Sequence, residues 1–243
     1  MPRFFLPPAA WQAEQPVLTG DEARHLAQVL RLQTGAVVHV FDGAGRHAPA
    51  EVLQVARDRV TLKLGAPLPA SSPSPVITLA QAIPKGKNMD LIVQKAVELG
   101  IASIQALITR HTIVHPGEGK ADKWRRTALE ACKQCGQNVL PEIPEPLSFD
   151  RWLAAQPAAV PGGLMLIASL APGARPLRQV LREHPATTAA TLLIGPEGDF
   201  TAQETTAALV AGFLPVSLGA IVLRVETATL FALSALRYEF GSC

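Results

Sequence analysis

The order of apolar runs after residue 75 constrains the fold more than any other feature of this sequence. Runs with strand character cover residues 76–81, 103–109, 164–169, 191–195 and 214–219. Amphipathic stretches between and after them predict helices over 88–100, 120–136, 176–184, 201–212 and 226–240. Strands that alternate with helices predict a largely parallel sheet with helices on both faces. The fold class expected for this part of the chain is therefore α/β.

A linker separates this part from a smaller one. Residues 67–75 read PLPASSPSP, and four prolines among nine residues cannot continue a helix or a central strand. Before the linker come a predicted helix over 21–32 and strand-like runs over 36–41, 50–55 and 59–64. We therefore expect a small β-rich domain over residues 1–70 and an α/β domain over 75–243.

Composition excludes several classes of protein. Hydrophobic residues make up 48% of the 243 residues and charged residues 17%, so the chain can bury a core and is not disordered as a whole. No run approaches the about 18 to 20 apolar residues that span a bilayer, and the apolar run at the N-terminus is too short for a signal peptide. Three cysteines are too few for a secreted disulfide scaffold. We expect a cytoplasmic protein with no membrane partner.

Positive charge gathers in the middle of the chain. Residues 66–137 hold nine basic and five acidic side chains, whereas residues 138–243 hold six and nine. Such a density could line a surface for a polyanion if the fold brings the side chains to one side. A solvated, unspecific basic face is the other interpretation of charge alone.

Two loops that follow predicted strands have unusual sequences. GPEGDFT, residues 195–201, leaves its strand through two glycines that permit close backbone approach and positive φ, and it enters a helix with the capping pair Thr201 and Glu204. SLGAIVLRVETA, residues 217–228, places Gly219 at a strand end, and Arg224 and Glu226 before the last helix. Because ligands of open α/β sheets bind beyond the carboxyl ends of strands, these loops suit a flat, partly apolar ligand. Ordinary tight turns, with the glutamates as helix-start carboxylates, would also explain each loop alone.

Other site signatures are absent or weak. The sequence has no G-x-G-x-x-G after the first strand of the larger domain, no P-loop motif and no G-x-S-x-G, so it offers no dinucleotide, P-loop or serine-hydrolase motif. Cys132 and Cys135 form a single C-x-x-C on a predicted helix, which favours packing residues over a zinc site. His111 and His115 lie four apart in HTIVHP, but Pro116 argues against the helix that a metal pair would need. We predict no metal site.

The two loops, in this order and with QKAVELG and EACKQCG upstream, resemble the bacterial 16S rRNA uridine N3-methyltransferases of the SPOUT class. The resemblance covers essentially the whole chain. RFF at residues 3–5, RHLAQVLRLQTG and FDGAG are similar to that family's small RNA-binding β-barrel, which is related to PUA domains.

The resemblance implies a SPOUT α/β domain with a trefoil knot, a bound S-adenosylmethionine, and a homodimer that builds the active site between subunits. The substrate that it implies is a uridine near the decoding region of the 16S rRNA, within the small ribosomal subunit. Carried onto this sequence, the catalytic residues are Glu197 and Arg224. The cofactor-binding residues implied are Ser169, Leu170, Ile194, Gly195, Pro196, Glu197, Gly198, Leu218, Gly219, Ile221, Leu223 and Thr227.

Two positions depart from the family pattern. Ile221 and Gln137 stand where the family usually has arginines, so two positive charges are missing near the expected RNA side. A non-catalytic RNA-binding relative therefore remains an alternative, as does a SPOUT methyltransferase that acts on transfer RNA.

The chemistry can be argued from the residue types. A uracil N3 has a solution pKa of roughly 9 to 10, comparable to tyrosine or lysine, so little nucleophilic anion exists at neutral pH. Glu197 could accept the N3 proton while Arg224 stabilises charge that develops on the uracil carbonyl oxygens. A purely structural role for Glu197 is an equal alternative.

The basic middle region then becomes the expected RNA surface, joined by arginines of the small domain. Phosphate contacts would supply most of its affinity. The RNA-binding residues expected are Arg3, Arg24, Arg31, Lys85, Lys87, Arg110 and Lys133.

Overall fold

The computed structural model describes residues 1–69, 74–114, 117, 119–156 and 162–241. Within them the chain forms two compact units. The first comprises Met1–Ser72 together with Leu129–Leu140, and the second comprises Pro73–Ala128 and Pro141–Cys243. The division of the sequence at the linker placed the later segment, Leu129–Leu140, with the α/β part of the chain, whereas here it belongs to the first unit. The expected linker falls partly on residues 70–73, which lie outside the described residues.

The first unit is built on a curled five-stranded sheet with the order β1-β3-β4-β5-β2. Only the β1–β3 pair is parallel, and the other three pairs are antiparallel. The sheet leaves β1 and β2 as edges, so the small β-barrel domain expected is a curled half-barrel. Its strands are β1 (Arg3–Phe5), β2 (Val17–Thr19), β3 (Val37–Phe41), β4 (His47–Val55) and β5 (Arg59–Leu64).

Alternating strand residues form the core of this unit. Phe4, Val38, Val40, Val52 and Leu62 are fully buried on one side of the sheet, as the period of two along a strand requires. A 3₁₀ helix η1 (Pro8–Gln12), the helix α1 (Gly20–Arg24) and a π-helical turn η2 (His25–Val29) complete the unit.

The helix predicted over 21–32 is shorter than expected. It is α-helical only to Arg24 and continues as the π turn, after which Arg31 takes a left-handed conformation with φ 52°. A non-glycine residue in that region ends regular helix.

The second unit is a seven-stranded, fully parallel sheet with the order β10-β12-β9-β11-β6-β7-β8. The prediction of a parallel α/β sheet is confirmed. Its strands are β6 (Val76–Ala82), β7 (Ser103–Ile108), β8 (Leu147–Ser148), β9 (Gly163–Ala168), β10 (Arg175–Pro176), β11 (Ala189–Ile194) and β12 (Leu214–Ser217). The helices are α2 (Asn88–Glu98), α4 (Phe149–Ala154), α5 (Leu177–Glu183), α6 (Ala202–Val210) and α7 (Val225–Phe240). The helix α3 (Lys120–Cys135) begins in this unit and from Leu129 on belongs to the first.

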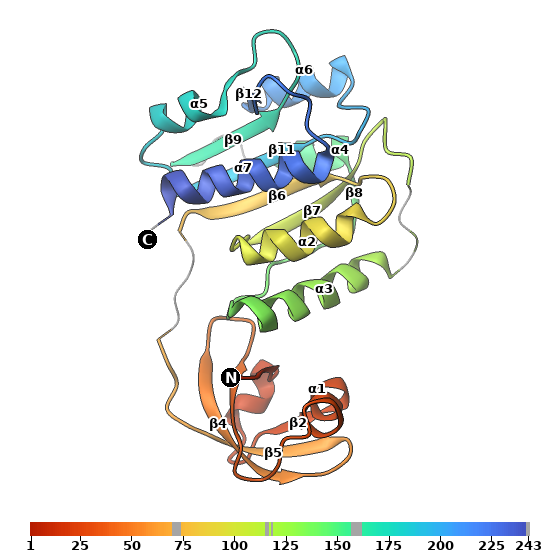
Figure 1. Cartoon of the computed structure of the whole chain (residues 1–243). Coiled ribbons are helices and arrows are strands. Elements are labelled where there is room, and N and C mark those ends of the chain that lie inside the picture. The colour runs from red at the N-terminus through yellow and green to blue at the C-terminus, as the bar shows by residue number, and fades with distance from the viewer. Residues whose placement is uncertain (70–73, 115–116, 118, 157–161, 242–243) are drawn as a thin grey trace. The chain divides into compact units, whose positions relative to one another are not determined.

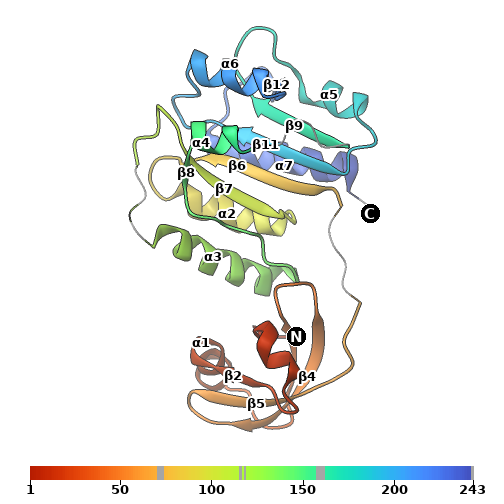
Figure 2. The ribbon, with the colours of Figure 1, turned by 180° about the vertical axis from the view of Figure 1, so that it is seen from behind.

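Helices cover both faces of this sheet. Ala80, Leu107, Ile167 and Leu193 pack with aromatic side chains of α4 and the small residues of α6. The neighbouring residues along the strands, such as Leu192, point to the opposite face. There α7 packs against β11 and α2, and both helices lie in front of the sheet in Figure 1 and behind it in Figure 2. No helix of the described residues is long and apolar enough to cross a membrane.

Candidate active site

The strand order brings three loops to one place. β12, β9 and β11 are neighbours and run parallel, so their carboxyl ends lie at the same edge of the sheet. The loops that follow them begin at Leu218, Ser169 and Gly195. Together with the N-terminal turns of α2 and α7 they line a pocket of about 390 Å³. This is where open α/β sheets bind ligands.

The loop after β11 is held by its own side chains. Asp199 takes the left-handed conformation with φ 56°, its Oδ1 accepts the N–H of Phe200 at 2.8 Å, and Phe200 enters the core beside Phe149. A Cβ at Gly195 would lie 3.0 Å from Asp199 Oδ1 and 3.2 Å from the Phe200 ring. Neither Gly195 nor Gly198 has the positive φ that a glycine permits; Asp199 has it instead.

Glu197 stands at the tip of this loop. It is exposed, and its Oε1 accepts the backbone N–H of Lys85 at 2.9 Å. The carboxylate is therefore not enclosed by apolar side chains. One of its oxygens is engaged by the loop after β6.

The loop after β12 forms the most open wall of the pocket. Gly219 has φ 129°, and a Cβ added there would meet nothing within 4 Å. Ser217 Oγ bonds the backbone of Gly219, with both contacts at 3.3 Å. Ile221 and Val222 are 78% and 72% exposed, so these two apolar side chains border the pocket and remain open to solvent. Gly219 is required here because a left-handed φ is strained for any residue with a side chain.

The first turns of α7 and α2 supply polar groups. Arg224 is the residue before α7 and is exposed, and its guanidinium makes no hydrogen bond or ion pair with the described part of the chain. Asn88 Nδ2 donates to Glu226 Oε2 at 3.1 Å, which links the two helix starts. The helix α2 begins at Asn88 after Lys87 and has no side-chain cap. The capping box of Thr201 and Glu204 on α6 is confirmed.

Most of the residues expected to bind the cofactor line this pocket. Those brought together are Ser169, Leu170, Ile194, Gly195, Pro196, Glu197, Leu218, Gly219, Ile221, Leu223 and also Arg224. Gly198 and Thr227 are not among the lining residues: Gly198 packs against His111, and Thr227 lies on the exposed side of the first turn of α7.

Sequence reasoning missed part of the lining. Asn88, Asp199 and Glu226 contribute polar groups, and Val222 contributes an apolar one. Asp199 and Glu226 belong to the same two sequence motifs and could have been included on that ground. Asn88 had no signal, because its partner Glu226 is 138 residues away in the sequence.

Comparisons with known proteins agree with this geometry. The family model described as RNA methyltransferase domain matches residues 71–237, which is more than half of the chain. The chain belongs to the RNA methyltransferase family. A second model, described as RNA methyltransferase PUA domain, matches residues 18–65. The expected PUA-like unit and SPOUT-type α/β unit are thus confirmed as the fold class.

Named relatives of this RNA methyltransferase cover nearly all of it. The chain is 33% identical over 227 residues to ribosomal RNA small subunit methyltransferase E of Synechocystis, covering 89% of this chain and 71% of the relative. The Bacillus subtilis protein of the same name is 26% identical over 98% and 97% of the two chains.

Solved structures give the same result. The Neisseria gonorrhoeae ribosomal RNA small subunit methyltransferase E bound to S-adenosyl methionine has a TM-score of 0.90 and 31% identity, with 99% and 98% of the chains covered. A Legionella pneumophila methyltransferase with bound SAM has a TM-score of 0.88 and 32% identity over the same shares.

Some of the basic residues expected to bind RNA have side chains without a partner among the described residues, and others are held in hydrogen bonds or ion pairs. Lys85, Lys87 and Arg110 follow β6 and β7 of the second unit, and their side chains are exposed with no partner in the described residues. In the first unit Arg31 is exposed, and Arg24 is exposed but paired with Asp21.

Arg3 and Lys133 are engaged by other residues of the first unit, and their expected binding to RNA stays a prediction. The Arg3 guanidinium contacts Asn138 Oδ1 and the carbonyl oxygen of Gln137, lies 5.1 Å from the Phe41 ring centre, and has its pKa lowered by burial. Lys133 Nζ is held by Glu22 at 2.8 Å and Glu130 at 2.9 Å. Burial opposes its charge, but these hydrogen bonds raise the pKa of Lys133. Gln137 thus takes part in the contact that fixes Arg3.

Cys132 and Cys135 of the C-x-x-C motif differ in their surroundings. Cys132 is buried, Cys135 is exposed, and burial raises the pKa of the Cys132 thiol to about 12, so it stays protonated. Within the described ranges no three His, Cys, Asp or Glu side chains gather closely enough to hold a metal ion. His115 lies outside the described residues.

Proposed function

We propose that this RNA methyltransferase transfers the methyl group of S-adenosylmethionine to N3 of a uridine in the 16S rRNA of the small ribosomal subunit. The observation that carries the proposal is the pocket formed by the loops after β9, β11 and β12. The proposal is also supported by the name of the relatives and by the similarity to a structure solved with S-adenosyl methionine.

The residues of the pocket fit the cofactor. Its volume of about 390 Å³ lies in the range of small-molecule sites, and its walls are apolar apart from a few polar groups. Leu170, Leu218 and Leu223 would contact the flat adenine, and the open space at Gly219 leaves room beside the backbone. When bound, S-adenosylmethionine supplies a methyl group activated by a sulfonium.

The chain's own residues have two tasks in the reaction. The Arg224 guanidinium has no partner among the described residues, so it is free to stabilise negative charge on a uracil carbonyl oxygen. Glu197 is oriented by the Lys85 N–H, and its second oxygen can accept the N3 proton. Lys85, Lys87 and Arg110 border the same edge of the sheet and would contact RNA phosphates.

The proposal includes a second copy of the chain. Four of the five exposed residues of α7 fall at helical spacing on one stripe, Thr227, Phe231, Ser234 and Tyr238. Phe231 and Tyr238 are 49% and 88% exposed. Aromatic side chains on an exposed helix face suit a symmetric interface. Light scattering should give twice the 25.8 kDa of one chain, and a monomer at micromolar concentration would contradict a shared active site.

The remaining parts of the proposal concern organisation. We assign RNA docking to residues 1–70 together with the basic side chains beside the pocket, and catalysis to residues 75–243. We place the reaction in the cytoplasm, where small subunits are assembled. The trefoil knot implied by the resemblance stays a prediction.

Calorimetry with S-adenosylmethionine tests the cofactor assignment. Leu223→Asp should weaken binding at least about tenfold, because a carboxylate would replace an apolar wall. Leu209→Asp is the matched control on the exposed side of α6 and should bind as the wild type does. Absence of binding by the folded wild-type protein would contradict the proposed function.

A further inference from the structure

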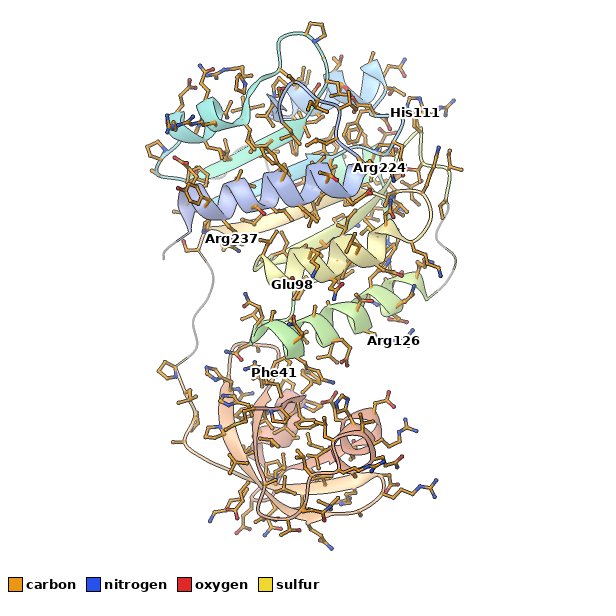
Figure 3. The ribbon with its side chains drawn as sticks, viewed as in Figure 1. Phe41, Glu98, His111, Arg126, Arg224 and Arg237 are labelled. Carbon is orange, nitrogen blue, oxygen red and sulfur yellow. The ribbon has the colours of Figure 1, made fainter. Side chains whose placement is uncertain are left out.

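His111 contacts the pocket loop from outside the pocket. Its Nδ1 lies 2.9 Å from the carbonyl oxygen of Gly198 and 2.9 Å from that of Asp199. Carbonyl oxygens only accept, so Nδ1 carries the hydrogen and donates to both. Figure 3 labels His111 and Arg224 at the same end of the second unit.

The imidazole ring also packs against the loop. A Cβ added at Gly198 would lie 3.1 Å from His111 Cβ and 3.3 Å from its Cγ, tighter than ordinary contact. Gly198 therefore has no side chain because the ring occupies the space beside it. This explains why a glycine is needed at a position that does not line the pocket.

His111 itself is fixed by the turn that carries it. The buried hydroxyls of Thr109 and Thr112 are 2.9 Å apart, and Thr112 Oγ1 accepts the N–H of Thr109 at 2.9 Å. The N–H of Arg110 donates to Glu204 Oε1 at 2.9 Å, which ties the same turn to the start of α6. The turn after β7 is thus a rigid support for the loop after β11.

The loop needs such support. Asp199 is a non-glycine residue with φ 56°, a conformation that few such residues adopt. It follows Pro196 and Glu197, both of which line the pocket. A change of backbone at Gly198 or Asp199 would move these two residues.

We infer that His111 is a positioning residue of the methyltransferase site: its Nδ1–H holds the Gly198 and Asp199 carbonyls and thereby sets the pocket wall formed by Pro196 and Glu197. The effect on cofactor affinity rests on the proposed function, whereas the effect on the loop does not.

Three variants test this role. His111→Ala removes the donor, His111→Asn keeps an amide N–H at nearly the position of Nδ1, and His184→Ala removes another imidazole whose Nδ1 contacts a carbonyl, that of Val180, in the same unit. In the free protein, His111→Ala should raise amide hydrogen exchange across residues 195–200 about tenfold, whereas His111→Asn and His184→Ala should leave it near the wild-type rate. Affinity for S-adenosylmethionine should fall about tenfold in His111→Ala and recover in His111→Asn.

The outcomes separate the two claims. Unchanged exchange in His111→Ala, or no recovery in His111→Asn, overturns the positioning role. If the wild type binds no S-adenosylmethionine, the proposed function fails while the exchange data still decide the role of His111. Should His111→Ala not fold, His111→Gln, whose amide lies one bond further out, carries the same comparison with His111→Asn.

Discussion

At the scale of single residues, the chemistry of the site depends on the surroundings of Glu197, Glu226 and Arg224. Glu197 and Glu226 each have one oxygen engaged, by the Lys85 N–H and by Asn88, and Arg224 has no partner in the described residues. A free arginine beside a pocket has no stabilising contact to lose. Its removal should therefore affect chemistry and not folding.

Arg224→Ala should lower the saturated methylation rate about 10²-fold or more, with little change in RNA affinity or melting temperature, because the contact forms mainly in the transition state. Arg126, an exposed arginine on α3 without a partner in the described residues, provides the matched control. Single-turnover kinetics beside RNA binding measures both effects. A wild-type saturated rate combined with lost RNA affinity would assign Arg224 to docking instead.

At the scale of elements, the helix α7 connects the pocket to the C-terminal end of α2. Its N-terminal turn lines the pocket, and at its other end Arg237 donates to the carbonyl oxygens of Leu99, Gly100 and Pro75. Leu99 and Gly100 terminate α2, where unpaired carbonyls favour a cation. Burial lowers the pKa of Arg237, but the backbone contacts hold it in place.

Arg237→Met should keep the aliphatic packing and leave three carbonyl oxygens without their donor. We expect a loss of about 2 kcal/mol and a melting temperature roughly 4 to 8 °C lower. Arg178→Met, at an exposed position of α5, is the control and should melt as the wild type does. Equal melting of Arg237→Met and wild type in a thermal scan would show that this contact contributes nothing.

The elements also show which strands and helices can be predicted from the sequence. Periodicity located β6, β7, β9, β11 and β12 within about two residues, because each is a run of apolar residues bounded by turn signals. Strands of two or three residues, β1, β2, β8 and β10, carry no periodic signal and were not predicted. The short helix α4 was missed for the same reason.

The sequence predicted the candidate site only in part, as it did the fold. Loops that stand after strands could be chosen from the sequence, since parallel strands end at one edge. The left-handed Asp199 and the pairs Asn88–Glu226 and His111–Gly198 could not, because they depend on contacts between residues far apart in the chain.

At the scale of the whole molecule, the parallel sheet of the second unit accounts for the pocket. β11 lies between β9 and β6, and β12 lies beside β9, so loops from distant parts of the sequence meet. The first unit belongs to the PUA type found with RNA methyltransferases. A cofactor pocket with free basic side chains beside it, in a chain that carries a PUA unit, is the arrangement that an RNA-modifying enzyme requires.

The most direct test of this account is mass mapping of methylated nucleosides after incubation with S-adenosylmethionine and either small ribosomal subunits or transfer RNA. We expect one new 3-methyluridine in the 16S rRNA and none in transfer RNA. Methylation of transfer RNA alone, methylation at another atom, or no methylation by a folded protein that binds the cofactor would contradict it.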